Sequence, residues 1–231
     1  MDWQALRLSL ALAAWTVVLL LPVSVIMGRF LGTRSFRGKG LVEGLVMLPL
    51  VLPPTVFGFY LLVLLGRGSP IGAAWQDLFG RQLVFTFEGL VLASVLFNLS
   101  FAIQPAQRAF EAIPTALREA AASSGMSPLR ALWAVELPLA WPGVVTAMVL
   151  TFAHTLGEFG VVLMVGGAIP GETRTIAIAI YDRVQAFDME AAATMSAVLV
   201  AISLATIAAT FALSARFSAR DSTRVGRRPE Q

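Results

Sequence analysis

The sequence contains five apolar stretches, each long enough to cross a lipid bilayer as a helix. The clearest is Leu8–Met27, which contains no charged residue. A transmembrane helix needs about 20 mostly apolar residues. This stretch is longer than the apolar core of a signal peptide, so we expect it to remain as a span. The sequence therefore predicts an all-α membrane protein with five transmembrane helices, at about 8–30, 44–66, 89–107, 142–165 and 191–215.

The composition excludes several classes of function. Of the 231 residues, 57% are hydrophobic and only 13% are charged, whereas a soluble domain carries about 25% charged residues. The absence of Cys excludes thiolate metal sites, and the single His excludes a multi-histidine site within one chain. The basic residues lie between the apolar stretches and near the C-terminus, which argues against nucleic acid as a partner. We therefore predict no metal site.

The distribution of basic residues predicts the orientation. When the loops are assigned alternately to the two sides, most of the 17 lysines and arginines fall on the side that holds the C-terminus. Basic residues of short loops favour the cytoplasm. We therefore expect the N-terminus outside, the loop 108–141 in the cytoplasm, a single membrane domain over 1–215 and a cytoplasmic basic tail over 216–231.

Three of the expected spans contain interruptions. Pro49, Pro53 and Pro54 fall in the second, where each proline removes a backbone donor. In lipid this is tolerated where protein or a water-filled cavity meets the freed carbonyls, so a kinked packing helix and a pathway-lining helix both fit. In the third span, Asn98, Ser100 and Gln104 are expected to bond across helices.

Glu158 falls near the end of the fourth span, flanked by Gly157 and Gly160. An acid at membrane depth normally faces the bundle interior or water. In an interior position, Glu158 is expected to bond backbone donors or an arginine of another helix, as part of a gate. Alternatively, the span ends early and Glu158 lies at the outer interface. His154 is expected to have a packing role.

The segment after this span carries several charges. Glu172 and Arg174 are candidates for an outer entrance, where Arg174 contacts an anion or a binding protein, or is a plain solvated charge. Residues 175–181 alternate like a strand, but a lone strand has no partner there. We expect a short helix that dips towards the membrane.

The loop 108–141 contains the start and stop residues of two short helices. The first runs from Thr115 to a stop at Gly125. The second begins at Ser127-Pro128 and is expected to end at Pro138 and Pro142, before the fourth span. A small face formed by residues 120–122 suits close approach of another protein. The alternative is an amphipathic loop on the bilayer surface.

The same loop resembles the EAA signature of the importer permeases of the ATP-binding-cassette class. The resemblance rests on Glu119-Ala120-Ala121, Gly125 and Val135-Glu136-Leu137-Pro138, at the spacing of that signature and with Val135 where Ile is usual. It implies that the loop docks on an ATPase subunit. The residues implied in this coupling are Arg118, Glu119, Ala120, Ala121, Gly125, Leu137 and Pro138.

Two further segments resemble the molybdate permease subgroup. They are the run 48–56, with Pro53 and Pro54, and Leu156–Gly160 followed by Ile169–Thr175. The gate candidates are Pro53, Pro54, Glu158, Phe159 and Gly160.

This resemblance implies a homodimer in a bacterial inner membrane, with two cytoplasmic ATPase subunits and an external binding protein that delivers molybdate or tungstate. A sulfate or thiosulfate permease of the same fold is the alternative. An ion-coupled carrier is disfavoured because the chain has no repeated halves.

The chain contains no phosphate-binding loop, since Gly38-Lys39-Gly40 lacks the required spacing and hydroxyl residue. We therefore expect no catalytic residue and no bound cofactor in this chain, with ATP and magnesium held by the partner ATPase.

Overall fold

The computed structural model describes the backbone of residues 1–225 and the side chains up to residue 208. Every regular element in this part of the chain is helical, as the sequence predicts. The helices are α1 (Trp3–Thr33), α2 (Lys39–Val51), α3 (Pro54–Leu65), α4 (Pro70–Phe79), α5 (Phe87–Phe97), α6 (Leu99–Glu111), α7 (Thr115–Ser123), α8 (Pro128–Ala131), the π-helical turn η1 (Leu132–Glu136), α9 (Leu137–Leu156), α10 (Gly160–Gly166), α11 (Ile176–Gln185) and α12 (Met189–Val225).

Three helical segments of the described chain are long and apolar enough to cross a membrane unbroken: Trp3–Thr33, Pro128–Leu156 and Met189–Ala208. Two helix pairs reach that length only together. They are α2 with α3, bent by 109°, and α5 with α6, bent by 42°. When each bent pair is counted as one span, the chain has the five spans that the sequence predicts.

The break between α2 and α3 has a local cause. The residue before a proline is pushed out of the helical region, and Leu52, which precedes Pro53, is extended at ψ 139°. Pro54 then occupies the first turn of α3, where its missing N–H does no harm. The second span is therefore two helices nearly at right angles, rather than one kinked helix.

The fourth span also differs from the expectation. Pro138 and Pro142 do not end a helix, because α8, η1 and α9 form one continuous helix of 29 residues from Pro128 to Leu156. Pro138 follows directly on the π turn Leu132–Glu136, and Pro142 lies inside α9. The span ends early, since α9 stops at Leu156 and the short helix α10 begins only at Gly160.

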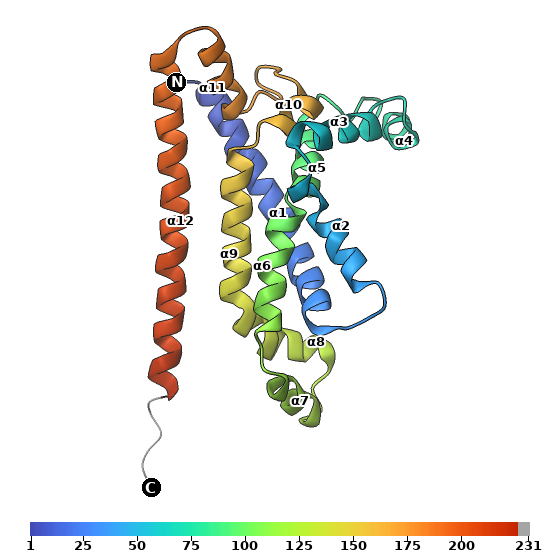
Figure 1. Cartoon of the computed structure of the whole chain (residues 1–231), viewed down its shortest axis with the longest axis vertical. Coiled ribbons are helices and arrows are strands. Elements are labelled where there is room, and N and C mark those ends of the chain that lie inside the picture. Colours follow the sequence, from blue (N-terminus) through green and yellow to red (C-terminus); the bar gives the residue numbers. More distant parts are fainter. Residues whose placement is uncertain (226–231) are drawn as a thin grey trace.

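Helices α1, α6 and α9 form the centre of the bundle along its long axis (Figure 1). A Cβ atom on Gly28 of α1 would lie 2.9 Å from Ala106 Cβ on α6, so glycine permits this close packing. The outer part of α12 packs on α1 and α11 through Met195. The segment expected to be a short helix after residue 174 is present as α11.

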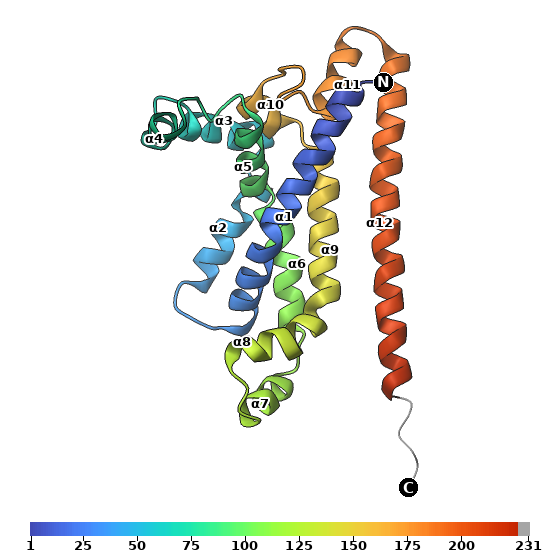
Figure 2. The ribbon, with the colours of Figure 1, turned by 180° about the vertical axis from the view of Figure 1, so that it is seen from behind.

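The two ends of the bundle carry different elements. Figures 1 and 2 show α3, α4, α10 and α11 at the end that holds the N-terminus, and α7 and α8 at the opposite end. The backbone of α12 runs as a helix to Val225, past the expected span end at 215. The side chains of the basic tail predicted over 216–231 lie outside the described residues.

Candidate functional site

Three helix breaks meet around one cavity inside the bundle. These are the breaks between α2 and α3, between α5 and α6 at Asn98, and between α9 and α10. The cavity has a volume of about 320 Å³. It is lined by Pro54, Thr55, Phe97, His154, Gly157, Glu158, Phe159, Gly160 and Val161. Irregular backbone at membrane depth is tolerated where it lines such a cavity. This is the place at which the spans are interrupted by non-helical backbone.

Four of the five predicted gate residues line this cavity: Pro54, Glu158, Phe159 and Gly160. Pro53 lies one residue earlier, at the bend, and is not part of the lining. Gly160 brings α10 against the start of α3, because a Cβ atom there would lie 3.0 Å from Pro54 Cβ. The sequence segments 48–56 and 156–160 therefore come together in space.

Glu158 lies in the protein interior, with 5% of its surface exposed. Its carboxylate accepts a hydrogen bond of 2.6 Å from Ser94 Oγ and another from Asn98 Nδ2. Backbone donors or an arginine were the expected partners, and neither is present among the described residues. Two neutral side chains of the broken α5–α6 span satisfy the acid instead, so that span is tied to the break after α9.

His154 extends this network. Its Nδ1 atom lies 2.9 Å from Asn98 Oδ1 and 3.7 Å from Glu158 Oε1. The ring stacks on Phe101 with centroids 4.1 Å apart, and Phe97 lies beside it at 5.5 Å. The expected packing role therefore accounts for only part of its environment, because the side chain is 32% exposed and lines the cavity.

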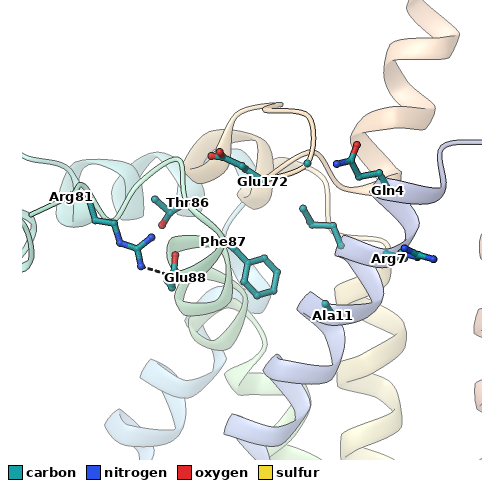
Figure 3. Close-up of a pocket in the computed structure, with 10 residues that line it drawn as sticks. Gln4, Arg7, Ala11, Arg81, Thr86, Phe87, Glu88 and Glu172 are labelled. Atoms are coloured by element: carbon teal, nitrogen blue, oxygen red, sulfur yellow. Dashed lines mark hydrogen bonds and ion pairs between the residues drawn. The ribbon is translucent and has the colours of Figure 1, made fainter. Parts of the chain in front are cut away.

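A second and more open pocket of about 550 Å³ lies at the end of the bundle that holds the N-terminus. In Figure 3, Gln4 of α1 lies across this pocket from the Arg81–Glu88 ion pair, with Glu172 above the pair, while the Arg7 side chain points away from it. Of the two predicted entrance residues, Glu172 lines the pocket.

Arg174, the other predicted entrance residue, is not among the residues that line this pocket. It pairs with Asp182 at 2.8 Å and lies 3.7 Å from Asp2. The contacts therefore link the start of α1 to α11.

At the opposite end, α7 and α8 form the two short helices of the predicted loop. Gly125 ends the first in the left-handed conformation at φ +73°. Four of the predicted coupling residues are exposed: Glu119, Ala120, Gly125 and Pro138. Leu137 is half-buried. Ala121 is 5% exposed, so it packs inward and does not belong to the expected small outer face.

A buried ion pair anchors this loop. Glu136 is 4% exposed and receives hydrogen bonds of 2.5 Å and 3.2 Å from the guanidinium of Arg29 on α1. Arg118 Nε lies 3.8 Å from the same carboxylate. Arg118 also donates to the backbone carbonyls of Phe110, at the end of α6, and Ile113, just after it. One cluster thus joins α1, α6, α7 and η1.

Sequence reasoning missed Arg29 and Glu136 as parts of the site. Arg29 was counted only among the basic loop residues that predict the orientation. Glu136 was considered only as part of the Val135–Pro138 motif. The available signal was the position of Glu136: it is an acid directly before an apolar span, and such an acid needs a partner.

The fold has close relatives among solved transporters. A chain of a bacterial ABC transporter involved in the import of the acidic polysaccharide alginate superposes with a TM-score of 0.75 at 15% identity, covering 92% of this chain and 78% of that one. An inward-facing MetNI methionine ABC transporter superposes with a TM-score of 0.68 at 19% identity, covering 94% of both chains. The chain therefore shares its fold with chains of bacterial ABC transporters.

The family follows from the sequence comparison. Residues 21–220 match the binding-protein-dependent transport system inner membrane components, and the chain belongs to that family. The molybdenum transport system permease protein ModB of Azotobacter vinelandii is 49% identical over 199 residues, which cover 86% of this chain and 88% of the relative. The ModB protein of Escherichia coli K12 is 36% identical over 198 residues, which cover 86% of each chain.

Proposed function

We propose that the chain is the permease subunit through which an ATP-driven importer carries molybdate, or tungstate, across the bacterial inner membrane. The observation that carries this proposal is the 49% identity to a molybdenum permease over most of both chains. A sulfate permease of Chlorella vulgaris is 32% identical over 166 residues, which cover 62% of that relative. The lower identity and coverage make sulfate the second candidate.

In this proposal the chain works as a homodimer, with the N-terminus outside and α7 and α8 in the cytoplasm. The cavity at the three helix breaks is part of the anion path. Its support is the lining itself, which combines Pro54 at the start of α3, Phe97 at the end of α5 and Glu158 in the break between α9 and α10. Two arrangements of one bundle are what alternating access needs.

The α7–α8 end is the docking surface for the ATPase subunit. It offers exposed Glu119, Ala120 and Gly125, with exposed apolar side chains beside them at Leu129 and Trp133. The cluster of Arg29, Glu136 and Arg118 then transmits the motion, because a rigid link between α7 and the spans α1 and α9 is required if the loop is to pull on them. Nucleotide and magnesium bind to the partner ATPase.

The pocket lined by Glu172 and Gln4 is the outer entrance, where an external binding protein docks. Its exposed charges are of both signs, Arg7 and Glu172 among them, so it matches a mixed polar surface better than a free dianion. We propose that selection of the anion takes place mainly on the binding protein.

Reconstitution in liposomes tests the proposal. The permease with its cognate ATPase and binding protein should take up molybdate only when ATP and the binding protein are both present. Stimulation of ATP hydrolysis by sulfate-loaded rather than molybdate-loaded binding protein would favour the sulfate candidate. Uptake without any ATPase would contradict the importer assignment altogether.

A further inference from the structure

We infer that His154 is the anion-binding group of the inner cavity, through its Nε2 atom, and that its ligand is a tetrahedral oxyanion. The inference rests on the proposed function, since it names the residue that contacts the transported anion. It comes from the hydrogen-bond network, which occupies both carboxylate oxygens of Glu158 and leaves one imidazole nitrogen of His154 without a partner among the described residues.

The network fixes which imidazole nitrogen carries a proton. Asn98 Nδ2 donates both to the backbone carbonyl of Ser94, at 2.8 Å, and to Glu158. The atom of Asn98 that faces His154 is therefore the carbonyl oxygen Oδ1, which only accepts. At 2.9 Å, Nδ1 of His154 must donate to it. Nδ1 is protonated, and Nε2 has no hydrogen-bond partner in the described part of the chain.

Glu158 cannot be the group that meets the ligand. Its side chain is 1% exposed, and each carboxylate oxygen already accepts a hydrogen bond from a neutral donor. The side chain of His154 is 32% exposed and lines the same cavity. The acid therefore lies behind the imidazole, where it orients the ring through Asn98.

The charges are consistent with an anion site. With Nδ1 protonated, a neutral imidazole offers only a lone pair at Nε2, which an oxyanion cannot use. The imidazolium offers an N–H donor and one positive charge, and the Glu158 carboxylate at 3.7 Å is its counter-charge. The faces of Phe101 and Phe97 beside the ring suit a cation. Thr55 also lines the cavity, and a hydroxyl can donate a hydrogen bond.

The site is weak by construction, as a transport path requires. The positive charge of the imidazolium is balanced by the carboxylate of Glu158. Glu158 is the only other titratable residue among those that line the cavity.

The single histidine of the chain makes a direct test feasible. The complete permease–ATPase complex is labelled with 15N-histidine, and the spectrum of an H154Q complex is subtracted to isolate one imidazole. Titration with sodium molybdate, against sodium chloride as control, should shift the Nε2 resonance while the Nδ1 resonance stays unchanged. An Nε2 resonance that does not respond to molybdate overturns the inference. If H154Q does not assemble, H154N serves for the subtraction.

Transport provides the second readout. Molybdate uptake by H154Q should fall by roughly tenfold, as expected when one charge-assisted hydrogen bond to the anion is lost. The matched control is T146V, on the same helix, because the Thr146 hydroxyl bonds only the Pro142 carbonyl of its own helix, at 2.9 Å. Wild-type uptake by H154Q would overturn the inference while leaving the proposed function intact. Failure of the wild-type complex to transport molybdate would instead overturn the proposed function.

Discussion

Arg29 on α1 and Glu136 on η1, which are 107 positions apart in the sequence, form a bidentate ion pair. Its shorter contact, from Arg29 Nε to Glu136 Oε2, is 2.5 Å. Glu136 is buried, and Arg118 of the coupling loop is its second basic neighbour. A buried pair is costly to break, because the remaining charge loses its partner in a medium of low polarity. The loop is thereby linked to a membrane span through charge as well as through the chain.

Loss of this pair should uncouple ATP hydrolysis from transport. In R29Q, Glu136 retains only the longer contact to Arg118, and we expect destabilisation of about 3 kcal/mol or more. The assembled complex should hydrolyse ATP with a lower molybdate uptake per ATP, measured in proteoliposomes. The control is R108Q, since Arg108 is 81% exposed in its pair with Glu111 and a surface pair contributes little. Equal coupling ratios in R29Q and R108Q would argue against the link.

Replacement of Gly125 should prevent assembly with the ATPase and leave the permease folded. The φ of +73° makes any side chain strained there by about 1 kcal/mol, although a Cβ atom would meet nothing within 4 Å. Gly80 is a matched control, with φ +70° and equally open space, at the other end of the bundle. G125L should fail to co-purify the ATPase, whereas G80L should retain it. Loss of the ATPase from both variants would point to backbone strain rather than docking.

The two glycines that flank Glu158 should respond differently to alanine. A Cβ atom on Gly160 would lie 3.0 Å from Pro54 Cβ and 3.2 Å from Thr55 N, which forces α10 away from α3. At Gly157 the nearest atom is 3.7 Å away, an ordinary contact. G160A should therefore lower the thermal stability by about 1–3 kcal/mol and reduce uptake, while G157A should resemble the wild type. Similar melting temperatures for the two variants would contradict the tight α3–α10 contact.

Removal of the Glu158 carboxylate should loosen the junction between α5, α6 and α9. In E158A, Ser94 Oγ and Asn98 Nδ2 lose their acceptor inside the protein, at a cost of about 1–3 kcal/mol for each unsatisfied group. E158Q keeps the shape and one acceptor, so its loss should be smaller. Thermal unfolding of the purified complex measures the loss of stability in E158A and in E158Q. The control is E190Q, since Glu190 is exposed. An E158A complex as stable as the wild type would show that this network does not hold the junction.

The features predicted correctly are those set by local chemistry. Apolar length specified the five spans, and Gly125 marked the end of α7. The prolines were less informative. Pro53 and Pro54 break a span completely, whereas Pro138 and Pro142 are accommodated within one. The difference depends on whether a helix turn begins at the proline and on which helix packs against it, and neither is visible from the residue itself.

The contacts between distant segments could not be predicted. Glu158 was recognised as a buried acid, but its partners Ser94 and Asn98 lie more than 50 positions away. Arg29 and Glu136 are further apart still. Such pairs depend on the relative rotation of helices, which one sequence without its packing does not specify.

That rotation is set in part by the π turn between α8 and α9. Each residue of an α-helix turns the chain by about 100°, and a π turn holds an additional residue within its wider loop of backbone. The π turn Leu132–Glu136 therefore takes up one more residue than a regular turn, without rotating the helix before it relative to α9. If the same residues formed a regular α-helix, α7 and α8 would turn by about 100° around the axis of α9. The π turn thus sets the direction in which α7 and α8 project from the fourth span.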